Sequence, residues 1–160
     1  MPLKPGDAAP HLTLPDTERK HTPLADLWRD GPLVLLFFPL AFTSTCTEEL
    51  CTVRDDIAAY GGLNARIVAL SVDSPWVLDR YRKELGADYL FLSDFNREAS
   101  TAFGILRTAP VGPGLVGVSE RAAFVIGTDG RIRYAWHDTN TSVIPPFDEI
   151  KQALAMNGSA

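Results

Sequence analysis

The chain has 160 residues, of which 46% are hydrophobic and 22% are charged, and its formal net charge is −5. This length and composition predict one folded domain over residues 1–160 and argue against a disordered chain. The charge is modest and no block of like charges occurs. We therefore expect neither nucleic acid nor an anionic membrane surface as a partner, because both bind basic protein faces.

The first 32 residues are rich in proline, aspartate and threonine, which predicts short extended pieces and turns. They lack the apolar stretch of a signal peptide, and the longest apolar run, within 33–42, is too short to span a bilayer. We expect a cytoplasmic protein. Thiols are kept reduced in that compartment, so neighbouring cysteines serve redox or metal chemistry more often than a structural disulfide.

Strands and helices alternate along the rest of the chain. Runs of mainly apolar residues predict buried strands at 33–38, 66–73 and 89–94. Helical spacing or a proline suited to a first turn predicts helices at 45–60, 75–85, 96–103 and 146–156. The turn signal Asp129-Gly130 predicts a hairpin with strands near 122–127 and 131–137. This order indicates an α/β fold with a central mixed sheet flanked by helices.

Both cysteines of the chain follow the first buried strand, at Cys46 and Cys51. Thr45 and Glu48 match a capping box, in which a hydroxyl caps the helix and a carboxylate three residues on bonds back. Cys46 would then lie in the first helical turn, where unpaired N–H groups and the helix dipole stabilise a thiolate. We expect Cys46 to be the more nucleophilic sulfur, on the same helical face as Leu50 and at the floor of a pocket.

The spacing of the cysteines limits how they can pair. Five residues of unbroken helix separate two Cα atoms by about 8.7 Å, whereas a disulfide requires about 4.4–6.8 Å. A Cys46–Cys51 bond therefore requires the first turns to unwind, which suits a transient disulfide. Two inert, buried cysteines are the alternative. A zinc site is disfavoured because it needs four ligands and none of His11, His21 and His137 shows ligand spacing.

The stretch FFPLAFTSTCTEELC resembles the active-site signature of the peroxiredoxin family, Pro-x-x-x-Thr-x-x-Cys. Pro39, Thr43 and Cys46 hold the three signature positions. Glu49 stands where the family commonly has a glutamate. The stretch SERAAFVIGTDGRIRY resembles the second family motif and places the family arginine at Arg121. The order of predicted elements also agrees over nearly the whole chain.

The resemblance implies a thioredoxin fold with an N-terminal extension, and thiol-dependent reduction of hydrogen peroxide and organic hydroperoxides. Cys46 would be the peroxidatic cysteine and Cys51 the resolving one, joined in an intramolecular disulfide that a thioredoxin-like protein reduces. The cysteine spacing resembles the Q-type group, or bacterioferritin comigratory proteins, whereas FFPLAFTSTC also resembles E-type alkyl hydroperoxide reductases. Because the first group tends to be monomeric and the second dimeric, we expect a monomer or a weak homodimer. No metal, flavin or nucleotide cofactor is implied.

The other site residues have chemical roles, and for three of them an alternative stays open. Arg121 can favour the thiolate and contact a peroxide oxygen, or it can be a surface arginine paired with Glu120 or Glu49. The Thr43 hydroxyl can accept from the peroxide, or it can be only a cap. Pro39 shapes the loop and shields the sulfur from water. Glu49 is either a partner of the arginine or a solvated helix carboxylate.

Several features leave alternatives open. We expect Phe42, Trp76, Phe103 and Trp136 to be core or pocket wall. The glycine- and proline-rich segment 107–118 is either an apolar lip for organic peroxides or a connection. Two other functions also fit the cysteines. One is a one-cysteine peroxidase that is resolved by an external thiol, and the other is a redox-sensing thioredoxin-fold module that passes oxidation to a partner.

Overall fold

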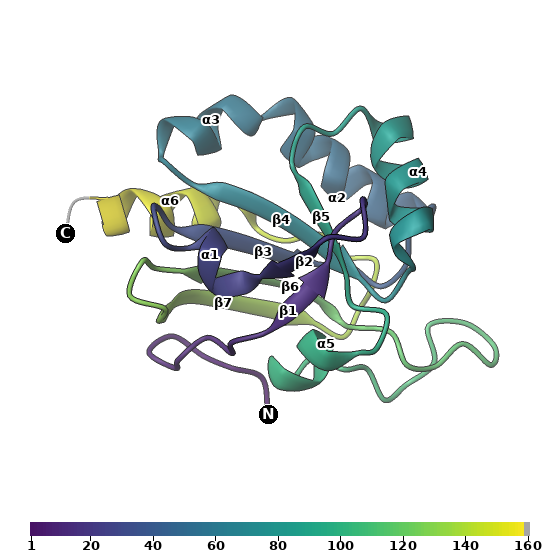
Figure 1. Ribbon diagram of the computed structural model, residues 1–160. Coiled ribbons are helices and arrows are strands. Elements are labelled where there is room, and N and C mark those ends of the chain that lie inside the picture. Colours follow the sequence, from purple (N-terminus) through teal and green to yellow (C-terminus); the bar gives the residue numbers. More distant parts are fainter. Residues whose placement is uncertain (159–160) are drawn as a thin grey trace.

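A five-stranded mixed sheet forms the centre of the computed structural model, which describes residues 1–158 (Figure 1). Its strands are β3 (Leu33–Phe37), β4 (Arg66–Ser71), β5 (Leu90–Ser93), β6 (Arg121–Ile126) and β7 (Ile132–Asp138). Their order across the sheet is β5-β4-β3-β6-β7. β3, β4 and β5 run parallel, whereas β6 is antiparallel to β3 and β7 is antiparallel to β6. The predicted strands and hairpin are confirmed.

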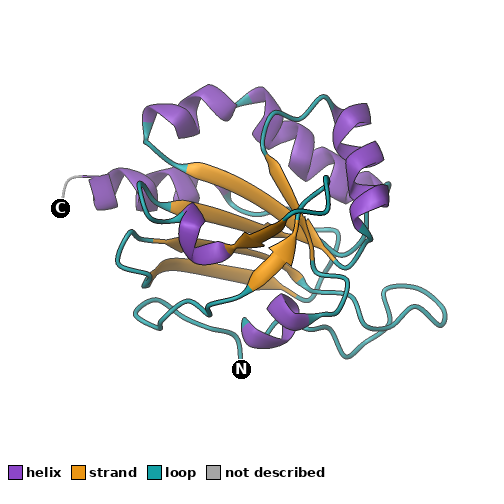
Figure 2. Ribbon diagram, viewed as in Figure 1, coloured by secondary structure: helices purple, strands orange, loops and turns teal. Residues whose placement is uncertain are grey.

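Helices and an N-terminal segment cover the two faces of the sheet (Figure 2). One face carries α2 (Ser44–Asp55), α3 (Ile57–Gly62), α4 (Pro75–Leu85) and α6 (Phe147–Gly158). The other carries α1 (Leu24–Leu27), α5 (Glu98–Ala102) and a two-stranded sheet of β1 (Thr13–Pro15) and β2 (His21–Pro23). The predicted mixed sheet flanked by helices, with an N-terminal extension, is confirmed.

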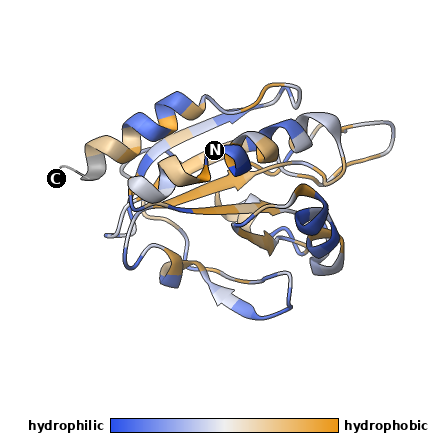
Figure 3. Cartoon of the chain, turned by 90° about the horizontal axis from the view of Figure 1, so that it is seen from above, coloured by the Kyte–Doolittle hydropathy of each residue, from blue (hydrophilic) through white to orange (hydrophobic). Residues whose placement is uncertain are grey.

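The central strand β3 is buried at every position, because both faces of the sheet are covered. Its alternate side chains enter different apolar clusters. Val34 and Leu36 pack on the side of α2 and α4. Leu35 and Phe37 pack on the side of α1 and α5. Figure 3 shows hydrophobic residues concentrated in these central strands. The chain that leaves β3 therefore enters α2 from the middle of the sheet.

The helix predicted over 45–60 is divided into α2 and α3 at Asp56. The N–H of Asp56 donates to the Val53 carbonyl at 3.1 Å, and this tighter turn ends α2. The Asp56 carboxylate also accepts from Lys151 of α6 at 2.6 Å. Ile57, the residue after Asp56, begins α3 and is half-buried.

The other predicted helices are confirmed, with ends displaced by no more than two residues. α4 begins where the sequence indicates, because the Ser74 hydroxyl accepts from the Val77 N–H at 3.3 Å and Pro75 occupies the first turn. The short helix α1 was not predicted. Within residues 1–158, no helix combines the length and the hydrophobicity that a membrane span requires.

Candidate active site

The segment 39–43 connects β3 to α2 and is held against the end of β4. The Ala41 N–H donates to the Asp73 carboxylate at 2.8 Å, and the Ser71 hydroxyl donates to the same oxygen at 2.6 Å. Phe42 then adopts left-handed backbone geometry (φ +66°), which bulky residues rarely adopt. This conformation turns the chain into the helix.

The helix cap is Thr43, not Thr45. Thr43 makes no side-chain cap bond, and its hydroxyl donates to the Leu40 carbonyl at 2.9 Å. The capping box predicted for Thr45 and Glu48 is wrong, because the turn before Thr43 starts the helix two residues earlier and both residues lie inside it. Cys46 nevertheless lies in the first helical turn, as predicted, and it is only 1% exposed.

Arg121, at the start of β6, reaches the sulfur from the neighbouring strand. Its Nη2 donates to Cys46 Sγ at 3.2 Å and to the Thr141 carbonyl at 2.7 Å. Its Nη1 donates to Glu49 Oε1 at 2.7 Å. Arg121 and Glu49 are both fully buried in the layer between β6 and α2. The alternatives of a surface arginine and a solvated glutamate are therefore wrong, because the covered sheet face excludes water from both.

Burial and charge act on this ion pair in opposite directions. Burial raises the pKa of Glu49 to about 7, although the positive charge of Arg121 opposes the shift. Burial lowers the pKa of Arg121, but the charges of Glu49 and Cys46 outweigh it and the net shift is upward. The guanidinium thus stays cationic. A fixed cation therefore lies in hydrogen-bond contact with the buried Cys46 sulfur.

A pocket of about 200 Å³ opens above the sulfur. It is lined by Pro39, Leu40, Thr43, Ser44, Thr45, Cys46, Val111, Arg121, Thr141 and Ser142. Pro39 and Cys46 are buried in its wall and floor, whereas Thr43 is exposed at the entrance. Val111 brings the segment 107–118 into the wall, so this segment does more than connect α5 to β6. A larger cavity, of about 520 Å³, lies beside the starts of β4 and β5 and has no cysteine in its wall.

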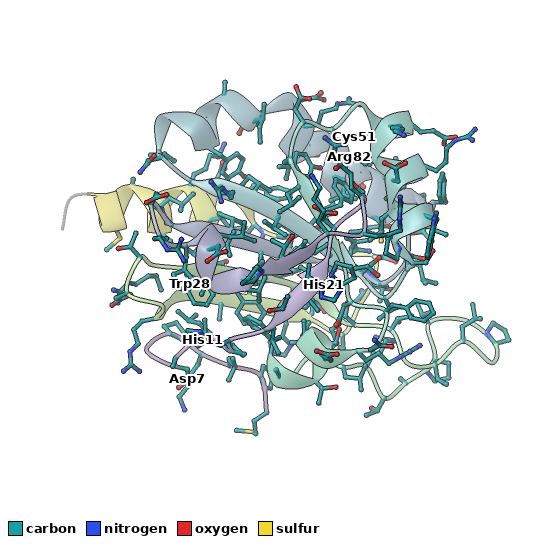
Figure 4. The ribbon with its side chains drawn as sticks, in the orientation of Figure 1. Asp7, His11, His21, Trp28, Cys51 and Arg82 are labelled. Atoms are coloured by element: carbon teal, nitrogen blue, oxygen red, sulfur yellow. The ribbon has the colours of Figure 1, made fainter. Side chains whose placement is uncertain are left out.

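Cys51 lies on the same helix but outside this pocket. Its side chain is half-buried and packs against the apolar cluster on the α2 face of the sheet (Figure 4). Both cysteines are free thiols, and α2 is continuous between them. A regular helix keeps their Cα atoms about 8.7 Å apart. The geometry therefore holds the thiols apart as long as α2 stays wound.

The three histidines and the two cysteines form no shared metal site within the described residues. His11 and His21 belong to the layer on the opposite side of the sheet from Cys51 (Figure 4). His137 pairs with the Glu120 carboxylate at 2.9 Å. In the part of the chain that the structure describes, no group of three or more metal-binding side chains is arranged to hold an ion.

The large aromatic residues divide into two groups. Phe103 is fully buried and Trp136 is half-buried against the core, as predicted. Phe42 and Trp76 are 53% and 66% exposed, so the prediction is wrong for both. The backbone turn at Phe42 and the position of Trp76 in the first turn of α4 leave them on the surface. The guanidinium of Arg19 lies over the Trp76 ring at 5.5 Å.

Sequence reasoning missed two contributors to the site. Thr141 acts through its backbone carbonyl, in an irregular segment after β7, so its side chain carries no signal. Val111 lies in a segment without periodic pattern, and its position depends on the fold of that segment. A backbone hydrogen bond from Val111 N–H to the Leu115 carbonyl, 2.9 Å, shapes a tight turn there.

These features define a class of protein, in which a mixed α/β sheet buries one cysteine at a helix start beside a guanidinium. The sequence profile of the AhpC/TSA family matches residues 5–135. A putative peroxiredoxin of Mycobacterium tuberculosis is 34% identical over 141 residues, 88% of each chain. Peroxiredoxin Bcp of Escherichia coli K12 is 32% identical over 143 residues, 88% of this chain and 90% of that one. The chain belongs to the AhpC/TSA family and is a peroxiredoxin, a thiol-dependent peroxidase.

Solved structures agree with this assignment. The crystal structure of peroxidoxin BcpB from Mycobacterium tuberculosis has a TM-score of 0.83 and 29% identity, and covers 96% of this chain and 97% of that one. Peroxiredoxin Q of Xanthomonas campestris, at 22% identity, has a TM-score of 0.80 over 92% and 91% of the two chains and supports the fold. The predicted thioredoxin fold and the likeness to Q-type, Bcp-like peroxiredoxins are confirmed. The E-type likeness of the active-site stretch stays a prediction.

Proposed function

We propose that this peroxiredoxin reduces hydrogen peroxide and organic hydroperoxides with Cys46 as its peroxidatic cysteine. The observation that carries the proposal is the 3.2 Å contact between Arg121 Nη2 and Cys46 Sγ, at the floor of an open pocket. No other cysteine of the chain contacts a guanidinium through a hydrogen bond within the described residues. A buried thiolate beside a fixed cation is a nucleophile that needs little rearrangement before it reacts.

In the first step the Cys46 thiolate attacks the terminal oxygen of the hydroperoxide. The S–O bond forms, the O–O bond breaks, and the departing alkoxide or hydroxide takes a proton to leave as alcohol or water. Negative charge thus moves from sulfur to the leaving oxygen. Arg121 can stabilise both, because its guanidinium lies at the sulfur and lines the pocket. Glu49 holds that guanidinium in place through Oε1.

Thr43 and Pro39 shape the approach of the peroxide. The Thr43 hydroxyl gives its proton to the Leu40 carbonyl, so its oxygen lone pairs are free to accept from the O–H of the substrate. Pro39 has no N–H to donate, and its ring is buried beside the sulfur, where it limits the access of water. Together they orient the peroxide toward Cys46 Sγ.

Cys51 is proposed to resolve the sulfenic acid. After α2 unwinds, the Cys51 sulfur attacks the sulfur of Cys46–SOH, the S–S bond forms, and hydroxide leaves with the thiol proton as water. A thioredoxin-like dithiol protein then supplies two electrons and returns both thiols. Support comes from the half-buried position of Cys51 on the same helix. A monomer or weak homodimer in the cytoplasm, with no nucleic-acid or membrane partner, stays a prediction.

Two variants and one mapping experiment test these roles. Cys46→Ser should abolish peroxide consumption, and an unchanged rate would disprove the peroxidatic role. Cys51→Ser should oxidise normally once but lose turnover with thioredoxin. Peptide mass spectrometry after one equivalent of peroxide should find a Cys46–Cys51 disulfide in the unaltered protein. If an external thiol adduct on Cys46 is found instead, the chain is a one-cysteine peroxidase.

A further inference from the structure

The four residues between the cysteines, 47–50, are tied to the rest of the molecule by side chains from outside α2. Tyr81 Oη, on α4, lies 2.9 Å from the Thr47 hydroxyl. Tyr89 Oη, just before β5, donates to the Leu50 backbone carbonyl at 2.6 Å. The third tie is the ion pair of the active-site arginine with Glu49. Two of the three external ties are thus tyrosine hydroxyls that the peroxide chemistry does not use.

Both tyrosine bonds end on the stretch that must change shape. A disulfide needs Cα atoms within about 6.8 Å, and the wound helix holds those of Cys46 and Cys51 about 8.7 Å apart. The backbone at 47–50 must therefore leave its helical geometry before the sulfurs meet. This movement turns the Leu50 carbonyl away from Tyr89 and carries Thr47 away from Tyr81, so both bonds are lost on opening.

The tyrosines themselves are anchored in the part that stays folded. Tyr81 is 2% exposed, and its ring contacts Phe38 and Phe91 with centroids 6.0 and 6.4 Å apart. Tyr89 is 6% exposed and stacks on Phe91 at 5.3 Å. Burial raises the pKa of both hydroxyls, that of Tyr81 to about 12, so both remain protonated at neutral pH. Each hydroxyl therefore stays in place while residues of α2 move away from it during unwinding.

We propose that Tyr81 and Tyr89 form a latch: they are positioning residues that hold α2 wound and so set the rate at which Cys46–SOH reaches Cys51. The proposal rests on the intramolecular resolution proposed above. A slow latch prolongs the life of the sulfenic acid. During that time a second hydroperoxide can transfer its terminal oxygen to the sulfur, which yields sulfinic acid and an alcohol. The two hydroxyls therefore also set the susceptibility to overoxidation.

Tyr89→Phe and Tyr81→Phe test the latch, because each removes one hydroxyl and keeps the ring that packs in the core. Losing one hydrogen bond should speed disulfide formation about three- to tenfold, with the larger effect at Tyr89, whose hydrogen bond is the shorter and more buried of the two. Stopped-flow fluorescence with excess peroxide separates Cys46 oxidation from the slower resolution, and mass spectrometry measures sulfinic acid. The oxidation rate should stay the same, while resolution accelerates and sulfinic acid decreases.

A matched control is Tyr134→Phe, which removes a tyrosine hydroxyl bonded to Glu149 on α6, away from the cysteines. It should leave the resolution rate within about twofold of the parent value, so a general loss of stability is separated from the latch. Equal resolution rates in Tyr89→Phe, Tyr81→Phe and the parent would overturn the proposal. So would an equal acceleration in the control.

Hydrogen exchange gives a second measurement that does not depend on the disulfide. Amides of 47–51 should exchange several-fold faster in reduced Tyr89→Phe than in the reduced parent, and those of α4 should not. If no Cys46–Cys51 disulfide forms in any protein, the proposed resolution fails, yet faster exchange would still support a tyrosine latch on α2. Unchanged exchange together with an unchanged resolution rate would leave the tyrosines with a packing role only.

Discussion

Cys46 and Cys51 share one helix but have different surroundings. Cys46 is 1% exposed, and a buried guanidinium, Arg121, donates to its sulfur. Cys51 is half-buried and lies near another arginine, Arg54, whose side chain is 36% exposed. The pKa of Arg54 is raised, first by its hydrogen bond to Asp55 and then by the charge of Cys51. Each thiol thus has a cation nearby, but only one of these cations is shielded from solvent.

The difference fits the order in which the two thiols act in the proposed cycle. Cys46 must react with a small, dilute peroxide, so the groups around its sulfur are already in position and shielded from solvent. The second waits until α2 opens and then meets a sulfur a few residues away. Proximity along the chain replaces a strong electrostatic environment in that step. We therefore expect large effects from changes near Cys46 and small ones near Cys51.

The largest effect should come from the buried arginine. Arg121→Lys keeps the positive charge. A lysine ammonium, however, cannot replace the planar guanidinium that donates to Cys46, Glu49 and the Thr141 carbonyl at the same time. We expect Cys46 oxidation to slow by about 10²–10³-fold, the usual loss when one donor to the reacting charge is removed. Stopped-flow oxidation of the reduced protein measures it. Arg133→Lys, at a surface ion pair, is the control and should change nothing. A loss below threefold in Arg121→Lys would contradict the proposed role.

Glu49 links the same ion pair to the pH dependence of stability. Its pKa in the folded protein, about 7, lies above the ordinary 4.5, so folding favours the protonated form. The stabilisation is complete below pH 4.5 and is lost as the pH rises through 7. Glu49→Gln cannot ionise, so it should gain about 3 kcal/mol of unfolding free energy relative to the parent over that range.

Denaturant unfolding of the two reduced proteins at several pH values measures this gain. Subtracting the unfolding free energy of the parent from that of Glu49→Gln at each pH removes the contributions of groups that titrate alike in both proteins. A difference that stays constant between pH 4.5 and 7 would show that Glu49 remains ionised throughout, as a fixed partner of Arg121.

The sheet was predictable because local pattern and tertiary environment agree there. A strand covered on both faces needs apolar residues at every position, and 33–38 meets that requirement without help from distant segments. Arg121 was also predictable as a site residue, but only through its resemblance to a family motif. An arginine entering an apolar strand does not by itself show that its partner is a thiol 75 positions away.

The start of α2 was not predictable, because distant contacts decide it. Local preference favours Thr45 as the cap. The fold selects Thr43 instead, since Asp73 fixes the Ala41 N–H and the Phe42 ring packs on Tyr81 with centroids 4.7 Å apart. These contacts stabilise a left-handed backbone that the sequence disfavours. The exposed position of that ring follows from the same turn.

The smallest expected effect is that of salt, and it tests the contrast between the two arginines directly. Salt at about 1 M shortens the screening length to about 3 Å. This weakens the electrostatic interaction of the partly exposed Arg54 with Cys51, but it hardly affects the interaction of the buried Arg121 with Cys46. Disulfide formation should therefore slow by about twofold, whereas oxidation of Cys46 by neutral hydrogen peroxide should keep its rate. Stopped-flow traces at low and high salt contain both phases. If oxidation slows as much as resolution, then solvent ions reach Arg121. In that case Arg121 is no better shielded from solvent than Arg54, and the proposed contrast between the two cysteine environments is wrong.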